Sequence, residues 1–217
     1  MKISVLGTGM VGHALATKLV ALGHEVMMAG RERSNEKAQA WAASNKAQSG
    51  NYQDAGRFGD MIVIATLGSA TLEVAKLAGA DALAGKIILD VTNPLDMSAG
   101  FPPTLIEDMT NTSSLGEQLQ AALPSAHVVK ALNTMNCDVM VDPARVPGDH
   151  DVFYCGNDQR AKETVATLLK SFGWTNPVDL GPIEAARGTE GLMNFWLRMY
   201  GAVGHADFNY KIVRAER

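Results

Sequence analysis

Residues 7–12 read Gly7-Thr8-Gly9-Met10-Val11-Gly12, and this G-x-G-x-x-G spacing is typical of backbone that binds a pyrophosphate. Gly7 permits a tight turn, Gly9 lets the backbone approach the phosphates, and Gly12 lets the following helix pack against the preceding strand. The N–H groups at the start of that helix, reinforced by the helix dipole, then hold the anion. The alternative is a structural glycine turn in another kind of α/β protein.

The elements around the glycines favour the phosphate-binding interpretation. An apolar strand, Lys2–Leu6, leads directly into the turn, and a helix follows it. Gly23 ends the helix, and His24–Ala29 is predicted to be a second strand, which completes a strand–helix–strand unit of about 30 residues. The apolar face of the helix is carried at three- and four-residue spacing by Val11, Ala14, Leu15, Leu19 and Leu22.

The segment after the second strand indicates which dinucleotide binds. NAD-specific sites usually place Asp or Glu at this strand end, to bind the ribose 2′-hydroxyl. Here the segment reads Ala29-Gly30-Arg31-Glu32-Arg33-Ser34-Asn35-Glu36-Lys37. Arg31, Arg33, Ser34 and Lys37 suit a dianionic 2′-phosphate and favour NADP over NAD. Glu32 could instead serve a 2′-hydroxyl, and Ser34 could simply be the N-cap of a solvated helix.

Strands and helices continue to alternate along the chain. This predicts an α/β fold of the Rossmann type, doubly wound, with a mainly parallel sheet, helices on both faces and a short C-terminal helical extension. The expected strands are Met61–Thr66, Lys86–Val91, His127–Leu132, Val152–Gly156 and Pro177–Leu180, and the expected helices are Ser69–Leu77, Leu115–Leu123, Ala161–Phe172 and Glu184–Tyr200. Ser98–Ser114 is expected to be an irregular loop near the mouth of the site.

Ligands of open parallel sheets lie beyond the carboxyl ends of the strands. Thr66 and Leu67 are therefore expected to meet the ribose and the adenine side of the cofactor. The residues expected to face the nicotinamide end are Asn93, Pro94, Asn133 and Thr134. The structural alternative is that Asn93-Pro94 only forms a turn and that Asn133 only caps a loop.

Composition predicts one globular domain over residues 1–217, with a C-terminal helical segment at about 182–205. The chain has 217 residues, 47% hydrophobic and 19% charged, with a formal net charge of −4, so no electrostatic footprint for nucleic acid is expected. No apolar stretch reaches the roughly 20 residues of a membrane span, and no signal peptide is expected before the first strand. Cys137 and Cys155 are expected to be inert thiols, with no metal site, and the expected location is the cytoplasm.

Several motifs together resemble a known family, the NADPH:8-hydroxy-5-deazaflavin (coenzyme F420-dependent) NADP oxidoreductases. The sequence is also similar to the NADPH-binding domain of six-transmembrane ferric reductases. The resemblance spans nearly the whole chain and is carried by Gly7-Thr8-Gly9, Gly30-Arg31 with Lys37, Asp90–Pro94, Ala126–Thr134, Val152–Asp158 and Asp179–Pro182 before an aromatic helix. It implies that Thr8 to Val11 contact the pyrophosphate and that Arg31 and Lys37 hold the 2′-phosphate. The chain departs from the family at Gly30, where Ser is usual, and by one extra residue before Lys37.

No arrangement of acid–base residues is evident. There is no Tyr-x-x-x-Lys pair, and His127 and His205 are expected to be structural. Hydride transfer between a nicotinamide and a flavin-like ring needs ring alignment and exclusion of water rather than an acid–base residue. The β-hydroxyacid dehydrogenases begin with a similar unit but add a large helical domain with a catalytic Lys, for which this chain has no room.

The sequence therefore predicts an NADP-dependent oxidoreductase that transfers hydride between NADP(H) and a flavin or deazaflavin, with FAD or FMN as further candidates. An acceptor pocket is expected from Leu67, Asn93, Pro94, residues 133–136, and Phe195 and Trp196 of the last helix, although these two aromatics fit core or a homodimer contact better. The alternatives are reduction of ferric chelates, quinones or another small acceptor, and a non-catalytic NADP(H)-binding module.

Overall fold

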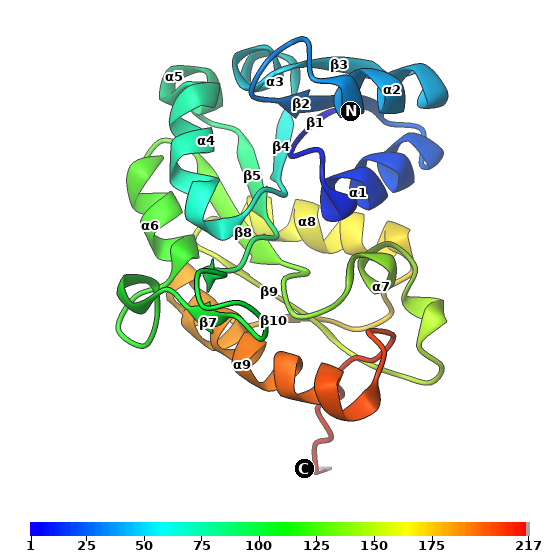
Figure 1. Cartoon of the computed structure of the whole chain (residues 1–217), viewed down its shortest axis with the longest axis vertical. Coiled ribbons are helices and arrows are strands. Elements are labelled where there is room, and N and C mark those ends of the chain that lie inside the picture. The colour runs from blue at the N-terminus through cyan, green and yellow to red at the C-terminus, as the bar shows by residue number, and fades with distance from the viewer. Residues whose placement is uncertain (216–217) are drawn as a thin grey trace.

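Residues 1–215, which the computed structural model describes, form an eight-stranded sheet between two layers of helices (Figure 1). The strands are β1 (Lys2–Leu6), β2 (Glu25–Gly30), β3 (Gln48–Asn51), β4 (Met61–Ile64), β5 (Ile87–Asp90), β6 (Leu95–Asp96), β7 (Thr104–Leu105), β8 (His127–Ala131), β9 (Val152–Gly156) and β10 (Pro177–Asp179). The helices are α1 (Met10–Ala21), α2 (Glu36–Asn45), α3 (Tyr52–Phe58), α4 (Thr71–Ala78), α5 (Ala80–Leu83), α6 (Leu115–Ala122), α7 (Cys137–Val141), α8 (Gln159–Phe172) and α9 (Ala186–Val203). Short 3₁₀ turns are η1 (Gly68–Ala70), η2 (Glu107–Met109), η3 (Pro143–Arg145) and η4 (Ile183–Ala185).

The strand order of the main sheet is β10-β9-β8-β5-β4-β1-β2-β3. Neighbouring strands are parallel except β8 and β9, which pair antiparallel. The carboxyl ends of β1, β2, β4, β5 and β8 therefore meet at one edge, whereas β9 and β10 run the opposite way. The order reverses between β1 and β4, the position where ligands bind such sheets. The predicted fold class, a mainly parallel Rossmann-type sheet with helices on both faces, is confirmed.

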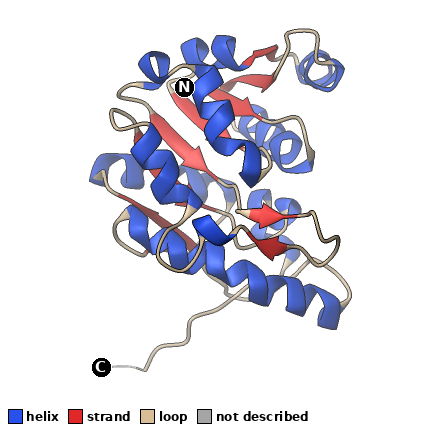
Figure 2. Cartoon of the chain, turned by 60° about the vertical axis from the view of Figure 1, so that its left-hand side comes forward, coloured by secondary structure: helices blue, strands red, loops and turns tan. Residues whose placement is uncertain are grey.

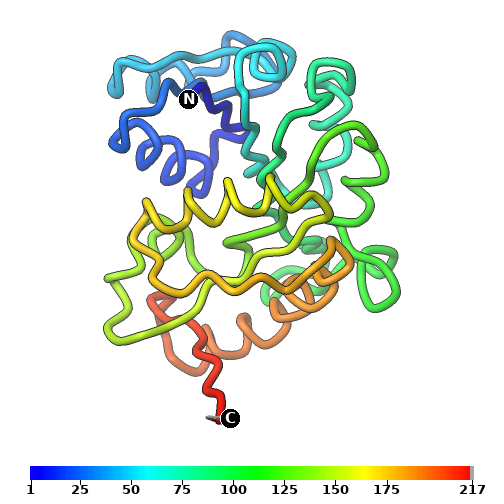
Figure 3. Tube along the Cα trace, turned by 180° about the vertical axis from the view of Figure 1, so that it is seen from behind, coloured from blue at the N-terminus to red at the C-terminus, as the bar shows by residue number. Residues whose placement is uncertain are grey.

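Two apolar clusters cover the two faces of the sheet. One lies under α1, α2, α7 and α8, and the other under α3, α4, α5, α6 and the start of α9. Figure 3 shows α8 crossing the sheet from behind. Members of the first cluster include Leu15, Leu19, Trp41, Val139 and Val165, and members of the second include Ala55, Val74, Leu83, Leu119 and Ala186. Because β1, β2, β4, β5, β8 and β9 each contribute side chains to both clusters, the central strands are apolar on both faces.

The predicted elements occur, with ends that differ by a few residues. The predictions lacked β3 and its flanking helices α2 and α3. β3 reads Gln-Ser-Gly-Asn and lies at the sheet edge, so it has neither the apolar run nor the alternation by which a strand is recognised. The suggested N-cap at Ser34 was wrong, because the side chain of Asn35 accepts a hydrogen bond from Ala38 N (3.0 Å) and starts α2.

The prediction of an irregular loop over Ser98–Ser114 was also wrong in part. This segment contains β7 and η2, and β7 pairs antiparallel with β6. Figure 2 shows these two short strands near the long helix α9. Ile106 N donates to Pro94 O (2.8 Å), which extends the pairing of the two strands to the loop after β5. Strands of two residues leave too short a pattern for recognition from sequence.

We predict that Gly56→Ala destabilises the fold, because a Cβ at this position of α3 would overlap the carbonyl oxygen of Ala78 at the end of α4. The expected loss is about 2–3 kcal/mol in the free energy of unfolding, measured by urea denaturation. Gly188→Ala on the exposed side of α9 is the matched control, since an added Cβ there meets no atom within 4 Å among the described residues. The control should be neutral or slightly stabilising. Equal effects would contradict the close approach of α3 and α4.

Candidate functional site

The glycine turn after β1 is formed by close backbone approaches. Gly7 has φ = 129°, and its N–H donates to Ala29 O (3.0 Å) at the end of β2. A Cβ on Gly7 would overlap the carbonyl oxygen of Ala65, and a Cβ on Gly12 would overlap that of Gly7. Both positions therefore exclude any side chain.

Gly9 is different, because a Cβ there would meet no atom within 4 Å in the described chain. Gly9 is the N-cap of α1, and within residues 1–215 no side chain caps this helix and its first turn holds no acid. Met10 is 81% exposed directly after it. The space over Gly9 and the uncapped helix start are what a bound pyrophosphate requires. This part of the chain therefore fits a dinucleotide.

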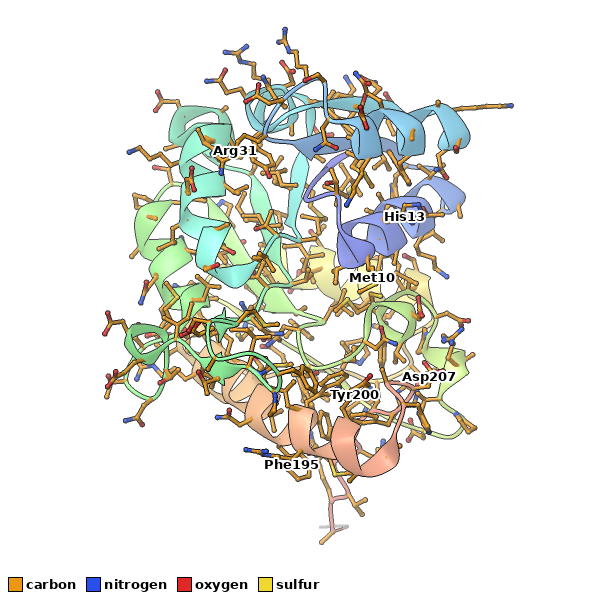
Figure 4. All side chains as sticks on the ribbon, viewed as in Figure 1. Met10, His13, Arg31, Phe195, Tyr200 and Asp207 are labelled. Atoms are coloured by element: carbon orange, nitrogen blue, oxygen red, sulfur yellow. The ribbon has the colours of Figure 1, made fainter. Side chains whose placement is uncertain are left out.

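Two of the cations predicted for the 2′-phosphate are held by carboxylates. Arg31 Nη1 lies 2.9 Å from Glu73 Oε1 on α4, with both side chains more than half exposed. Arg33 makes two bonds to Asp54 on α3, from Nε (2.6 Å) and Nη2 (2.5 Å). The hydrogen bond from Arg33 lowers the pKa of Asp54, so this carboxylate is ionised at neutral pH. Figure 4 shows Arg31 beside α4.

Lys37 lines a cavity of about 1040 Å³ that begins at Thr8, Gly9 and Met10 and continues along the outer side of α1. Ser34 is exposed. Gly30 is buried, and a Cβ there would lie 2.8 Å from Cγ of Asn35. A side chain at position 30 would thus collide with the Asn35 side chain.

A second cavity, of about 410 Å³, lies at the carboxyl ends of β4 and β5. Predicted residues Val11, Thr66, Leu67 and Asn93 all line it. The remaining lining is mostly apolar and includes three methionines. Met135 belongs to the predicted segment 133–136, whereas Asp96, Met97, Ile106 and Met140 were not predicted to line the site. Leu67 is 72% exposed and Met97 54%. This cavity is an apolar slot beside the glycine turn.

Asn93, which lines this slot, forms a hydrogen-bonded amide pair with the buried Asn133. Asn93 Nδ2 donates to Asn133 O (2.7 Å), and Asn133 Nδ2 donates to Asn93 Oδ1 (2.8 Å). Leu132, just before Asn133, is a buried non-glycine residue with φ = 65°. This backbone conformation costs free energy and aims Asn133 across to the β5 loop.

Gly68 brings the β4 and β5 loops together. A Cβ on Gly68 would overlap the carbonyl oxygen of Asn93. This contact was not predicted, because nothing in the sequence distinguishes Gly68 from an ordinary turn glycine.

Two buried polar atoms at this position lack a hydrogen-bond partner in residues 1–215: Thr66 Oγ1 and Asn133 Oδ1. Buried polar atoms are rarely left unsatisfied, so each is a candidate contact for a ligand. A carboxamide such as that of nicotinamide offers donors and an acceptor that suit them. The residues present therefore fit NADP(H).

A cluster of three charged side chains lies next to the amide pair in the sequence of β5 and β8. Two of them, Asp90 and Lys130, each precede a member of the pair by three residues, and the third, Glu190, comes from α9. Lys130 Nζ lies 2.8 Å from Asp90 Oδ2 and 2.7 Å from Glu190 Oε1, and all three side chains are at most 2% exposed. Asp90 Oδ1 accepts from Thr92 N (2.9 Å) and Oγ1 (2.7 Å). Glu190 on α9 also accepts from the N–H groups of Leu115 (2.8 Å) and Gly116 (3.0 Å) at the start of α6. Burial alone would lower the pKa of Lys130, but the two carboxylates outweigh it and raise that pKa.

Three of the residues predicted for the nicotinamide end, Pro94, Asn133 and Thr134, do not line the slot. Pro94 contributes its carbonyl to the hairpin, and Thr134 is buried. Phe195 and Trp196 lie elsewhere on α9: Trp196 stacks on Tyr200 (5.6 Å) and on Phe208 (5.3 Å), and Phe195 lies near Tyr210. These two aromatics therefore do not line the slot, and the packing of Trp196 agrees with the favoured interpretation that they serve core or contact packing. Figure 4 shows Phe195 on the outer side of α9.

Two other reactive residues, His127 and Cys155, are distant from this edge or inert. His127 begins β8, at the opposite edge, with Nδ1 3.8 Å from Asp158 Oδ2. Cys155 is buried, which raises the pKa of its thiol to about 12. Among residues 1–215, no group of three or more His, Cys, Asp or Glu side chains is placed to hold a metal ion.

Comparison with known proteins agrees with this geometry. Residues 2–94 match the family model described as NADP oxidoreductase, coenzyme F420-dependent. A crystal structure from Arthrobacter sp. FB24, provisionally assigned as an F420-dependent NADP reductase, superposes with a TM-score of 0.94 at 48% identity, covering 99% of this chain and 100% of that one. The chain belongs to the coenzyme F420-dependent NADP oxidoreductase family.

Two curated relatives of this family member differ in length. The F420-dependent NADP reductase of Methanocaldococcus jannaschii is 29% identical over 204 residues, which cover 88% of this chain and 89% of that protein. Rat metalloreductase STEAP3 is 31% identical over 191 residues, 88% of this chain but only 36% of STEAP3. The chain thus spans about a third of STEAP3. Over residues 1–215, no helix has the length and apolarity needed to cross a membrane.

For this NADP oxidoreductase family member, we predict that Arg31→Ala raises the Kd of NADPH about 10- to 100-fold and that of NADH less than about threefold, measured by fluorescence titration. The reason is that only NADPH carries the 2′-phosphate. Arg33→Ala is the matched control and should have the smaller effect, because Arg33 is already bound bidentately by Asp54. Equal losses for NADPH and NADH in Arg31→Ala would contradict the assignment of Arg31.

Proposed function

We propose that the protein transfers hydride between NADP(H) and a flavin or deazaflavin whose ring lies against the nicotinamide in the slot. The observation that carries this proposal is the apolar slot that adjoins the glycine turn through Val11. Three methionines, Leu67 and Ile106 offer surfaces on which a planar ring can lie. Bound NADPH would supply the hydride, and the protein would supply alignment and exclusion of water.

In this proposal residues 7–12 bind the pyrophosphate, and the 2′-phosphate is bound by Arg31, Arg33, Ser34 and Lys37. Thr66 and Leu67 contact the ribose side. The Asn93–Asn133 pair binds the carboxamide, and Pro94 and Thr134 fix the loops around that pair. Arg33 would contribute less than Arg31, because Asp54 holds it. The phosphate must displace Glu73 from Arg31, and a dianion is favoured in that exchange because it accepts more charge-assisted hydrogen bonds than a carboxylate.

The slot supports ring-to-ring hydride transfer without a general acid. Among the described residues that line it, Asp96 is the one ionisable side chain. Hydrogen bonds from Ser98, mainly from its backbone N–H, lower the pKa of Asp96. Asp96 is therefore a carboxylate at neutral pH and holds no proton to donate. Reduction of a carbonyl needs such a donor, whereas a flavin-type ring takes its proton from solvent.

Two finer features are part of the proposal. We propose a homodimer, supported by Phe195, which is 52% exposed on α9 beside a row of stacked aromatics. We also propose action in the cytoplasm, where NADPH is available.

The decisive test is NADPH oxidation with a panel of acceptors: a deazaflavin, FMN, FAD, a quinone and a ferric chelate. We expect saturable turnover with the deazaflavin or a flavin, measured as the loss of NADPH absorbance. Turnover with only the quinone or the ferric chelate would favour the alternative reductase. Tight NADPH binding with no accelerated oxidation by any of them would show a binding module instead.

Asn133→Ala tests the amide pair. It removes the bond to Asn93 Oδ1 and the Asn133 amide itself, while Asn93 Nδ2 can still donate to the backbone oxygen of residue 133, so kcat/KM for NADPH should fall about 10- to 100-fold at a fixed acceptor concentration. The control is Asn45→Ala on α2, whose amide donates to Trp41 O (2.9 Å) and does not line the slot. An unchanged kcat/KM in Asn133→Ala would contradict the assignment of the Asn93–Asn133 pair to the cofactor site.

A further inference from the structure

The buried cluster of Lys130, Asp90 and Glu190 has an unequal number of charges. Every atom placed within hydrogen-bond distance of the carboxylate oxygens of Asp90 and Glu190 by the described residues is a donor: Lys130 Nζ, Thr92 N and Oγ1, Leu115 N and Gly116 N. Except for the Thr92 hydroxyl, these partners are N–H groups that cannot accept a hydrogen bond, so a proton on Glu190 would replace a bond by a repulsive contact. Burial raises the pKa of Glu190, and the Lys130 ammonium and the backbone N–H groups act against that rise. With both carboxylates ionised, one ammonium faces two of them.

This net negative charge lies directly next to the slot along β5, one residue before its lining begins. Asp90 ends β5, and Val91 and Thr92, the next two residues, line the slot. Lys130 is the register partner of Asp90 on β8, three residues before Asn133. The partial positive charge at the start of α6 offsets some of the excess, since it stabilises the Glu190 carboxylate. No described side chain other than Lys130 neutralises the two carboxylates by direct contact.

We propose that this cluster is an electrostatic positioning unit that favours the oxidised, positively charged nicotinamide over the neutral reduced ring. The proposal rests on the proposed function, because it takes the nicotinamide to lie in the slot. A fixed negative charge in a buried environment stabilises a positive ring more than a neutral one. It makes bound NADPH a stronger hydride donor, and Glu190, which lies on α9 outside the slot, contributes through Lys130 and Asp90.

The cluster also holds the frame that receives the ring. Asp90 fixes Thr92 through two hydrogen bonds, and Thr92 immediately precedes Asn93. On the other strand, Lys130 precedes Leu132, whose strained backbone turns Asn133 toward Asn93. The charge is thus rigidly placed relative to the amide pair, as a preorganised field requires.

The test measures two dissociation constants, for NADP⁺ and for NADPH, by calorimetry or fluorescence without an acceptor. In Glu190→Gln, the ratio Kd(NADP⁺)/Kd(NADPH) should rise about threefold to tenfold over the wild-type ratio, because one buried negative charge is removed. The matched control is Arg187→Gln. Arg187 also joins α9 to α6, through Glu117 (2.8 Å), but on the exposed surface, so its removal should leave the ratio unchanged. A purely structural role for Glu190 would weaken binding of both nucleotides equally.

Should Glu190→Gln fail to melt cooperatively, the combined variant Lys130→Met, Asp90→Asn, Glu190→Gln replaces it. This variant removes all three charges together, and buried ion clusters tolerate such joint replacement better than loss of one partner. The same rise in the ratio is expected. A ratio within twofold of wild type in whichever variant folds overturns the proposal. Failure of the wild-type protein to bind either nucleotide would overturn the proposed function instead.

Discussion

The ion cluster of Lys130, Asp90 and Glu190 is the interaction on which the assembly of the two halves of the chain depends. Removing three charges from water is costly, and the cost is recovered only if their partners are placed to within hydrogen-bond distance. The partners come from β5, β8, α6 and α9, which are separated by up to 100 residues along the chain (Asp90 to Glu190). A shift of α9 along the sheet would leave a buried carboxylate without its donors. The cluster therefore fixes the C-terminal helix relative to the strands that carry the slot.

A second constraint is close backbone contact at three glycines. Gly7 touches the β4 end, Gly12 touches Gly7, and Gly68 touches the β5 loop. These contacts bring the carboxyl ends of β1, β4 and β5 within reach of one ligand. The resulting site consists largely of backbone groups, amides and apolar side chains, which is suited to holding two rings in contact rather than to moving protons.

The strands, turn and helix that carry the first half of this site could be predicted from sequence, because their signals are local. G-x-G-x-x-G lies in six consecutive residues, and the strands on either side are continuous apolar runs. The predicted cations were correctly found at the end of β2, but their carboxylate partners were missed, because Glu73 and Asp54 lie 42 and 21 residues away. No local pattern indicates which of several surface acids an arginine meets.

The rest of the site depends on contacts that only the fold creates. Asn93 and Asn133 were predicted individually, whereas their pairing depends on the left-handed Leu132, for which a leucine gives no signal. The two-residue strands of the hairpin are too short to show a period, so Asp96, Met97 and Ile106 were not expected in the slot. The aromatics of α9 could not be assigned to one environment from sequence, because their helical spacing fits any apolar environment; here Trp196 packs on Phe208 and Tyr200, which agrees with the favoured packing role and not with a place in the acceptor pocket.

Exposed apolar side chains around the slot have a thermodynamic consequence. Met10, Leu67, Met97 and Phe101 are each more than half exposed, and all come from loops or helix starts at the carboxyl edge or from the hairpin. Covering such surface releases ordered water and lowers the heat capacity of the complex. Ligand association at this edge should therefore become more exothermic as temperature rises. Apolar side chains around the slot stay in contact with water in the unliganded protein, and ligands that cover them gain affinity without any added charge.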